Sequence, residues 1–126
     1  MELKSSLGPL EQRVMGKVWG LYDKQPLMVR QVFEAVRDEH RIAYNTVLTV
    51  MIRLVEKGFL NRVKSGKAHK FVPMVSQRKT LKSIVGRMMQ TMVDQFGTEA
   101  LTAFADEIEK LTIEEKKMIV KKLKDY

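Results

Sequence analysis

Five polar residues within the stretch 43–60 are the candidates for chemistry with a ligand. Tyr44, Asn45, Thr46, Thr49 and Arg53 lie where a helix would leave its non-apolar side open. An ordinary solvated face would carry more Glu and Lys, which favour water and helix. Short side chains that donate and accept hydrogen bonds, together with one long cation, suit base edges and phosphates in a DNA groove. The residue types and their spacing therefore favour DNA binding.

Each of these residues has its own candidate contact. Arg53 suits a phosphate or a guanine, Asn45 suits an adenine, and the two threonines suit a thymine methyl group or a phosphate. Ala43 is a poor helix cap, so the alternative role of the Asn45 side chain is to satisfy the backbone at the start of the helix. Thr46, Thr49 and Arg53 are therefore preferred over Asn45 as base or phosphate contacts.

Residues for catalysis or metal binding do not form a set. The chain has no cysteine, which excludes disulfides and thiolate metal sites. His40 and His69 are the only histidines, and neither has an Asp or Glu at metal-ligand spacing. A surface or phosphate-contact role suits each of them better. We expect no enzymatic activity, no metal and no cofactor.

Positive charge is concentrated in one segment. The formal net charge is +8, and residues 41–70 hold seven cations against the single acid Glu56. These cations are Arg41, Arg53, Lys57, Arg62, Lys64, Lys67 and Lys70. Residues 97–126 are close to neutral, with six lysines and seven acids. An anionic partner is therefore expected at the segment that contains the five polar residues.

Hydrophobic spacing predicts three helices before residue 60. They cover residues 10–22, 28–39 and 43–60, and Gly58 supplies the stop of the third. The apolar stripe of the first helix comprises Leu10, Val14, Val18 and Leu21, widened by Met15, Trp19 and Tyr22. Neither residue before the second helix is a good cap, so its start is expected to fray.

A hairpin follows the third predicted helix. Residues 59–64 and Ala68–Pro73 are strand-like, and Ser65, Gly66 and Lys67 form the turn. Three helices followed by a basic hairpin predict a winged helix-turn-helix domain, in which the third helix enters the major groove and the wing touches the backbone. The wing cations are Arg62, Lys64, Lys67 and Lys70.

The remaining chain predicts a helical dimerisation region. Residues 76–96, Thr98–Glu109 and a last helix capped by Thr112 and Glu115 are amphipathic. Their apolar surface is too small to be buried by these helices alone, so pairing with a second chain is expected. The predicted interface residues are Leu81, Val85, Met88, Met92, Phe96, Leu101, Phe104, Ile108, Ile119 and Leu123. Met88, Met89 and Met92 alternatively line a ligand pocket, although flexible packing at an interface is the preferred interpretation.

The whole chain is thus expected to be mainly α with a small β-hairpin, divided into a DNA-binding domain at 1–75 and a dimerisation region at 76–126. No segment is apolar enough to cross a bilayer, and the N-terminus lacks the apolar core of a secretory signal. We therefore expect a soluble, cytoplasmic protein. The alternative is a winged-helix module that docks on an acidic protein, and an RNA binder is ranked last because few aromatics are available for stacking.

Four segments in this order resemble the penicillinase-repressor (BlaI/MecI) family. They are LGPLEQRVMGKVW, VRQVFEAV, AYNTVLTVMIRLVEKGFLNR and GKAHKFVP. The resemblance implies a homodimeric winged-helix repressor that occupies a palindromic operator and blocks transcription. It also implies DNA-recognition roles for Tyr44, Asn45, Thr46, Thr49 and Arg53.

The resemblance is incomplete in the dimerisation region. Antibiotic-responsive members of the family are cleaved between an asparagine and a phenylalanine after a membrane sensor is triggered. Here the matching position reads Ala103-Phe104, without the asparagine. A regulatory protease or sensor is therefore a partner that the resemblance alone suggests. Copper-responsive relatives carry cysteine pairs near the C-terminus, which this chain lacks.

Overall fold

The computed structural model describes residues 7–125 and confirms a mainly α chain with a small hairpin. Residues 1–6 of the predicted DNA-binding domain and residue 126 of the predicted dimerisation region lie outside the described part. The elements are α1 (Pro9–Leu21), α2 (Val29–Arg37), α3 (Tyr44–Glu56), β1 (Leu60–Ser65), β2 (Ala68–Pro73), α4 (Gln77–Phe96), α5 (Thr98–Glu109) and α6 (Ile113–Lys124). The chain divides into two compact units, Met1–Lys82 and Ser83–Tyr126, and the boundary between them lies within α4.

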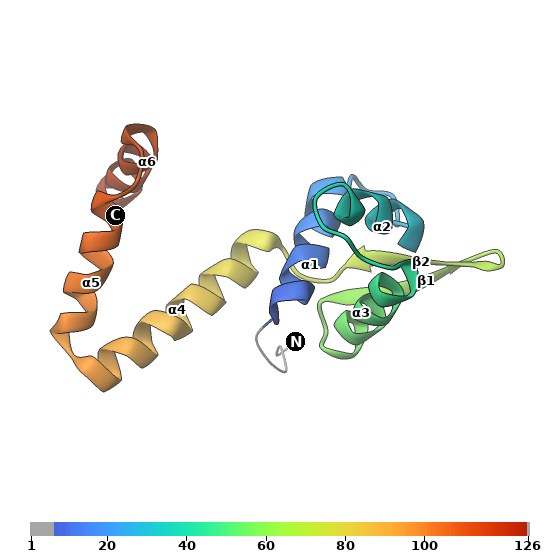
Figure 1. Ribbon diagram of the computed structural model, residues 1–126, viewed down its shortest axis with the longest axis horizontal. Helices are drawn as coiled ribbons and strands as arrows, with labels where there is room; N and C mark the ends of the chain where they lie inside the picture. The colour runs from blue at the N-terminus through green and yellow to red at the C-terminus, as the bar shows by residue number, and fades with distance from the viewer. Residues whose placement is uncertain (1–6, 126) are drawn as a thin grey trace. The chain divides into compact units, whose positions relative to one another are not determined.

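The core of the first unit lies between α1, α2 and α3, which group together beside the hairpin (Figure 1). Each helix contributes apolar residues at the spacing that places them on one face. The fully buried members include Val14, Met15, Val18, Val32, Val36, Val47, Met51 and Leu54. Phe59 and Phe71 close this core from the side of the hairpin, so α3 is fixed on its inner face and open on its outer face.

The first helix differs from the prediction at both ends. Leu21 and Tyr22, which were expected on the buried stripe, are exposed, because α1 ends at Leu21 and both residues lie beyond Val18, the last buried residue of the helix. Glu11 near the start is instead buried, and its Oε1 accepts a 2.8 Å hydrogen bond from the backbone N–H of Gly8. A charged residue therefore occupies a position that an apolar pattern does not reveal.

The start of α2 has no side-chain cap, as expected, but it is anchored by contacts that its own sequence does not reveal. Leu27 forms an isolated bridge with Phe71, with two backbone hydrogen bonds of 2.8 Å. The Gln31 side chain accepts a further hydrogen bond from the backbone N–H of Met28, at 2.8 Å. These contacts replace the side-chain cap that the sequence lacks.

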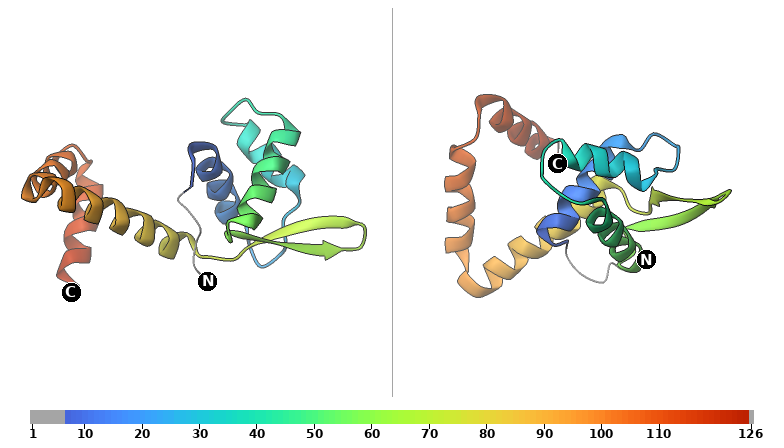
Figure 2. Two further views of the ribbon diagram at one scale, coloured as in Figure 1. Left: turned by 90° about the horizontal axis from the view of Figure 1, so that it is seen from below. Right: turned by 45° about the vertical axis from the view of Figure 1, so that its right-hand side comes forward.

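The hairpin agrees with the prediction to within one residue. β1 and β2 pair antiparallel with Leu60 opposite Pro73 and Ser65 opposite Ala68, which leaves a two-residue loop. Gly66 in that loop has a φ of +63°, a left-handed conformation that glycine adopts without strain. The hairpin extends away from the three helices (Figure 2), so its tip is open to a partner.

The second unit contains the greater part of α4 together with α5 and α6. Gly97, with a φ of +65°, separates α4 from α5. The predicted capping box at α6 is confirmed: Thr112 Oγ1 accepts from the Glu115 N–H at 3.2 Å, and Glu115 Oε1 accepts from the Thr112 N–H at 3.0 Å. Most apolar side chains of this unit remain exposed.

Candidate nucleic-acid interface

The outer face of α3 presents all five predicted polar residues to solvent. Tyr44, Asn45, Thr46, Thr49 and Arg53 are exposed, whereas Val47, Val50, Met51 and Leu54 of the same helix are buried. The buried residues recur every three or four positions, and this spacing turns the polar residues outward. The outer face of the helix is therefore polar and accessible, and its inner face is held in the core.

Two of these residues have partners within the fold. The Tyr44 ring meets the Phe33 ring edge to face, with centroids 5.6 Å apart. The Thr49 hydroxyl donates to the Asn45 carbonyl oxygen at 2.9 Å, which leaves its oxygen lone pairs and its methyl group for a ligand. No side chain caps the start of α3, and no hydrogen bond within residues 7–125 involves the Asn45 side chain. The alternative in which Asn45 serves the backbone is therefore wrong for this structure.

The wing presents its cations along both strands. Arg62, Lys64 and Lys67 are exposed and Lys70 is half-buried. The Arg62 guanidinium lies 5.5 Å from the centroid of the buried Phe71 ring, a cation–π contact that fixes the base of the wing. The charge of Lys67 lies in the two-residue loop at the tip.

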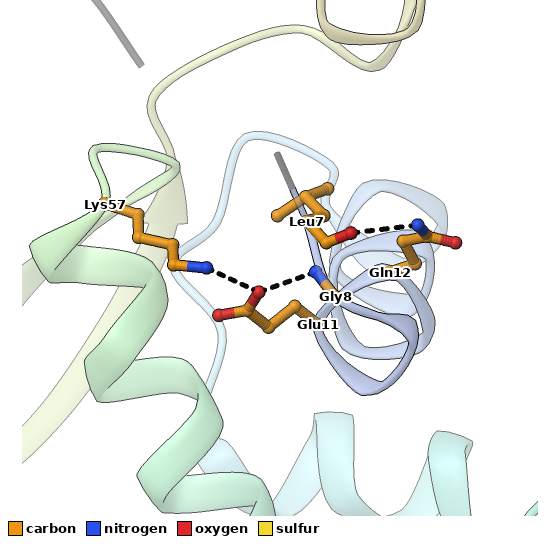
Figure 3. Close-up of polar contacts among 5 residues, drawn as sticks. All are labelled: Leu7, Gly8, Glu11, Gln12 and Lys57. Carbon is orange, nitrogen blue, oxygen red and sulfur yellow. Dashed lines mark hydrogen bonds and ion pairs between the residues drawn. The ribbon is translucent and has the colours of Figure 1, made fainter. Parts of the chain in front are cut away.

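Lys57 is a structural residue, although it belongs to the same cationic segment. Its ammonium lies 2.7 Å from Oε1 of Glu11, the oxygen that also accepts from the Gly8 N–H (Figure 3). The Glu11 side chain is 5% exposed and that of Lys57 is 23% exposed. This pair joins the start of α1 to the C-terminal end of α3, so it fixes α3 against the rest of the unit.

The electrostatics of Glu11 reflect this arrangement. Burial raises the pKa of its carboxyl, but the hydrogen bonds from Lys57 and Gly8 and the charges of Lys57 and Arg53 lower it by more, so the net shift is downward. The second oxygen, Oε2, is buried and has no hydrogen-bond partner in the described part of the chain. The influence of Arg53 also shows that this side of α3 adjoins Glu11.

The opposite flank of α3 carries residues that the sequence analysis did not single out. Leu48 and Ile52 line a pocket together with Tyr44 of the same helix. Its rim includes the cations Arg30 of α2 and Arg62 of the wing, together with His69. The spacing of four between positions 44, 48 and 52 could have indicated a shared flank, but it resembles an ordinary core pattern.

The predicted dimerisation residues remain largely uncovered. Eight are exposed, namely Leu81, Val85, Met88, Met92, Phe96, Leu101, Ile108 and Leu123, whereas Phe104 and Ile119 are half-buried. Met92, Phe96, Ala103 and Phe104 line an apolar pocket in the second unit. Exposed apolar surface of this extent is typical of an interaction site.

The sequence profile described as "Penicillinase repressor" matches residues 7–125. The chain belongs to the penicillinase repressor family. It is similar to the transcriptional regulator BlaI of Mycobacterium tuberculosis, in strains CDC 1551 and H37Rv, with 38% identity over 68 residues. That match covers 54% of this chain and 48% of the relative, so the chain spans about half the length of the curated relatives it matches.

A solved structure shares the fold. It is the solution structure of the monomeric form of Bacillus licheniformis BlaI in complex with the blaP half-operator. The TM-score is 0.50 at 22% identity, over 61% of this chain and 90% of that chain. The winged helix-turn-helix architecture expected from the sequence is thereby confirmed.

Membership of the penicillinase repressor family also confirms the expectation that the protein is not an enzyme, because this is a family of repressors. Among residues 7–125, no three His, Asp or Glu side chains gather where they could hold a metal ion. None of the helices in that part of the chain has the length and hydrophobicity that crossing a bilayer requires.

Proposed function

We propose that this protein is a DNA-binding transcriptional repressor that acts as a homodimer on a palindromic operator. The observation that carries the proposal is the exposed polar face of α3 beside a cationic wing, within one compact unit. Membership of a repressor family and a structural neighbour in complex with a half-operator support it.

In this proposal α3 enters the major groove and supplies base contacts. Thr46, Thr49 and Arg53 meet base edges or phosphates, and the Asn45 amide, which has no hydrogen-bond partner within residues 7–125, pairs with adenine. Tyr44 is held against Phe33, so it reaches the DNA with little loss of side-chain freedom. The inner face of α3 is buried, which keeps these side chains in one orientation.

The wing supplies affinity that does not depend on sequence. Each of Arg62, Lys64, Lys67 and Lys70 that neutralises a phosphate releases counterions, with a slope of about −0.9 in log affinity against log salt. Four such contacts amount to a slope of about −3.6 for each protomer. Lys57 is excluded from this count because it pairs with Glu11.

The second unit joins two protomers in this proposal. Its exposed apolar residues, from Val85 to Leu123, become covered when two chains meet, together with Leu81 near the end of the first unit. A symmetric dimer places two α3 helices in successive major grooves, about 34–36 Å apart. A bound dimer that spans a promoter excludes RNA polymerase, and repression follows from that occupancy.

Selection of bound fragments from the source genome tests DNA recognition. We expect enrichment of one inverted-repeat duplex, and a footprint in which both half-sites are protected. Recovery of unrelated fragments in proportion to their abundance would contradict the proposal and would favour a module that docks on an acidic protein.

Truncation after Lys82 tests the division of labour. The first unit ends there and includes Thr80, which is buried and donates to the Ser76 carbonyl oxygen at 2.8 Å. We expect a folded monomer in sedimentation that has lost most of its affinity for the selected duplex. If the truncated protein stays dimeric, the assignment of the interface to the second unit is wrong.

A further inference from the structure

One flank of α3 is apolar although it is open to solvent. Tyr44, Leu48 and Ile52 follow one another at intervals of four residues, so they lie along one line of the helix. Tyr44 is 41% exposed, Ile52 is 37% exposed and Leu48 is half-buried. The buried face of α3 is formed by other residues, so packing within the fold does not account for Leu48 and Ile52.

The surroundings of this flank favour a polyanion. The pocket beside it is lined by α2, α3 and both strands of the wing, with Arg30 from α2, Arg62 from β1 and His69 from β2. None of its lining residues is an Asp or Glu. The adjoining pocket over Phe33 adds Arg37, again without an acid among its lining residues. An apolar strip between cations matches a surface that is negatively charged at its edges and has apolar groups between them.

Duplex DNA has that pattern in its major groove. Phosphates line both edges, and the only methyl group that a standard base presents in the groove is the C5-methyl of thymine. A helix that enters the groove with Leu48 and Ile52 turned toward the base edges therefore has thymine as its apolar partner. The other three base edges offer hydrogen-bonding groups that these two side chains cannot satisfy.

We propose that Leu48 and Ile52 are specificity-determining residues that contact thymine C5-methyl groups, so that each half-site carries thymine opposite this flank of α3. Arg30 and His69 then contact the phosphates on either side of that thymine, beside Arg62. This inference rests on the proposed function, because it assigns a base preference to the same helix. It adds an apolar contribution to the polar contacts of Thr46, Thr49 and Arg53.

Deoxyuridine substitution tests the contact directly, because it removes only the methyl group. The probe is the duplex enriched from the source genome, with each thymine in turn replaced by deoxyuridine in both half-sites. We expect about fourfold weaker binding for each methyl lost at the contacted position, and about 16-fold for the symmetric pair, from the free energy of burying one such group. A scan in which no substitution weakens binding would overturn the inference, and it requires no protein variant.

Protein variants then assign the methyl group to its partner. At one position of the half-site, each of the variants Leu48→Ala and Ile52→Ala is expected to bind the thymine duplex and the deoxyuridine duplex with nearly equal affinity. The native protein distinguishes these two duplexes at that position. Leu21→Ala removes an exposed leucine from α1 and should preserve the full discrimination. The assignment would be overturned if both α3 variants distinguished thymine from deoxyuridine as well as the native protein does. Unchanged DNA affinity in both variants would also overturn it. That second result is expected if this flank docks on an acidic protein.

The proposed function and the methyl contact fail under different results. If no duplex is enriched, the proposed function fails and the methyl contact fails with it. If an inverted repeat is enriched and bound specifically, but its thymine methyl groups do not affect affinity, only the methyl contact fails.

Discussion

The Glu11–Lys57 pair predicts an asymmetric response to mutation. Lys57→Met leaves the Glu11 carboxylate, whose side chain is only 5% exposed, with one hydrogen bond from the Gly8 N–H among residues 7–125 and with the charge of Arg53 nearby. Glu11→Gln leaves an ammonium that is 23% exposed and can be hydrated, beside an amide oxygen that can still accept from it. The first change strands a charge where water cannot reach it, whereas the second does not.

The magnitudes follow from that difference in burial. Removing one partner of a buried ion pair costs about 3–5 kcal/mol, and we take the lower end, about 3 kcal/mol, for Lys57→Met because the pair reaches the surface at Lys57. Glu11→Gln weakens hydrogen bonds without leaving a buried charge, which costs about 1 kcal/mol. For a unit of this size, 1 kcal/mol corresponds to about 4–8 °C in Tm. We expect Tm to fall by about 12–24 °C for Lys57→Met and by about 4–8 °C for Glu11→Gln.

Tryptophan fluorescence during urea unfolding measures this effect in the first unit. Trp19 is the only tryptophan of the chain, and its indole N–H donates to the Val75 carbonyl oxygen at 3.0 Å. Lys17→Met is the matched control, because Lys17 pairs with Glu39 at 2.6 Å where both groups reach water, and its effect should be the smallest of the three. A loss for Glu11→Gln that equals or exceeds the loss for Lys57→Met would refute the account of this pair.

Two further predictions concern pH and DNA contacts. Because the folded-state pKa of Glu11 lies below its unfolded value, its contribution is present above an ordinary pKa of 4.5 and lost as pH falls through the folded value. Glu11→Gln should remove this part of the acid dependence in urea titrations, and an unchanged profile would contradict it. Lys67→Gln should weaken binding to all duplexes and reduce the salt slope by about 0.9 per protomer, whereas Thr46→Ala should change the preference among duplexes. Lys110→Gln, in the second unit, is the control, and equal weakening of every sequence by both variants would exclude base recognition by Thr46.

Local signals in the sequence were sufficient to predict most elements. The turn at Gly66 specified the hairpin because few residues accept a left-handed φ in a two-residue loop. Thr112 and Glu115 marked the start of α6 because their reciprocal hydrogen bonds involve residues three apart. These features depend on neighbours in the chain, and a sequence displays neighbours directly.

Features that depend on distant residues could not be predicted. Leu27 is paired with Phe71, 44 positions away, so the anchored start of α2 is invisible in its own sequence. Lys57 looked like one more cation of a DNA-binding segment until its contact with Glu11, 46 positions away, was seen. The burial of Glu11 and the exposure of Leu21 have the same cause, since local periodicity does not show where packing ends.

The candidate site was predicted in part for the same reason. The exposure of Tyr44, Asn45, Thr46, Thr49 and Arg53 followed from helical periodicity, whereas their roles toward DNA and the dimer contacts of the second unit stay predictions. The flank formed by Leu48 and Ile52 was missed because apolar residues on a helix are normally assigned to the core. The exposure of Ile52 and the position of the flank beside Arg30 and Arg62 became visible only in the structure.

A competition measurement tests the central claim most directly. The affinity of the full chain for the duplex enriched from the source genome is compared, at physiological salt, with its affinity for an unrelated duplex of equal length. Specific recognition by α3 predicts a ratio of about 10³ or more, because specific protein–DNA complexes exceed nonspecific ones by at least this factor. A ratio below about ten, with binding to both duplexes lost together as salt rises, would show that charge alone attracts DNA and would contradict the account.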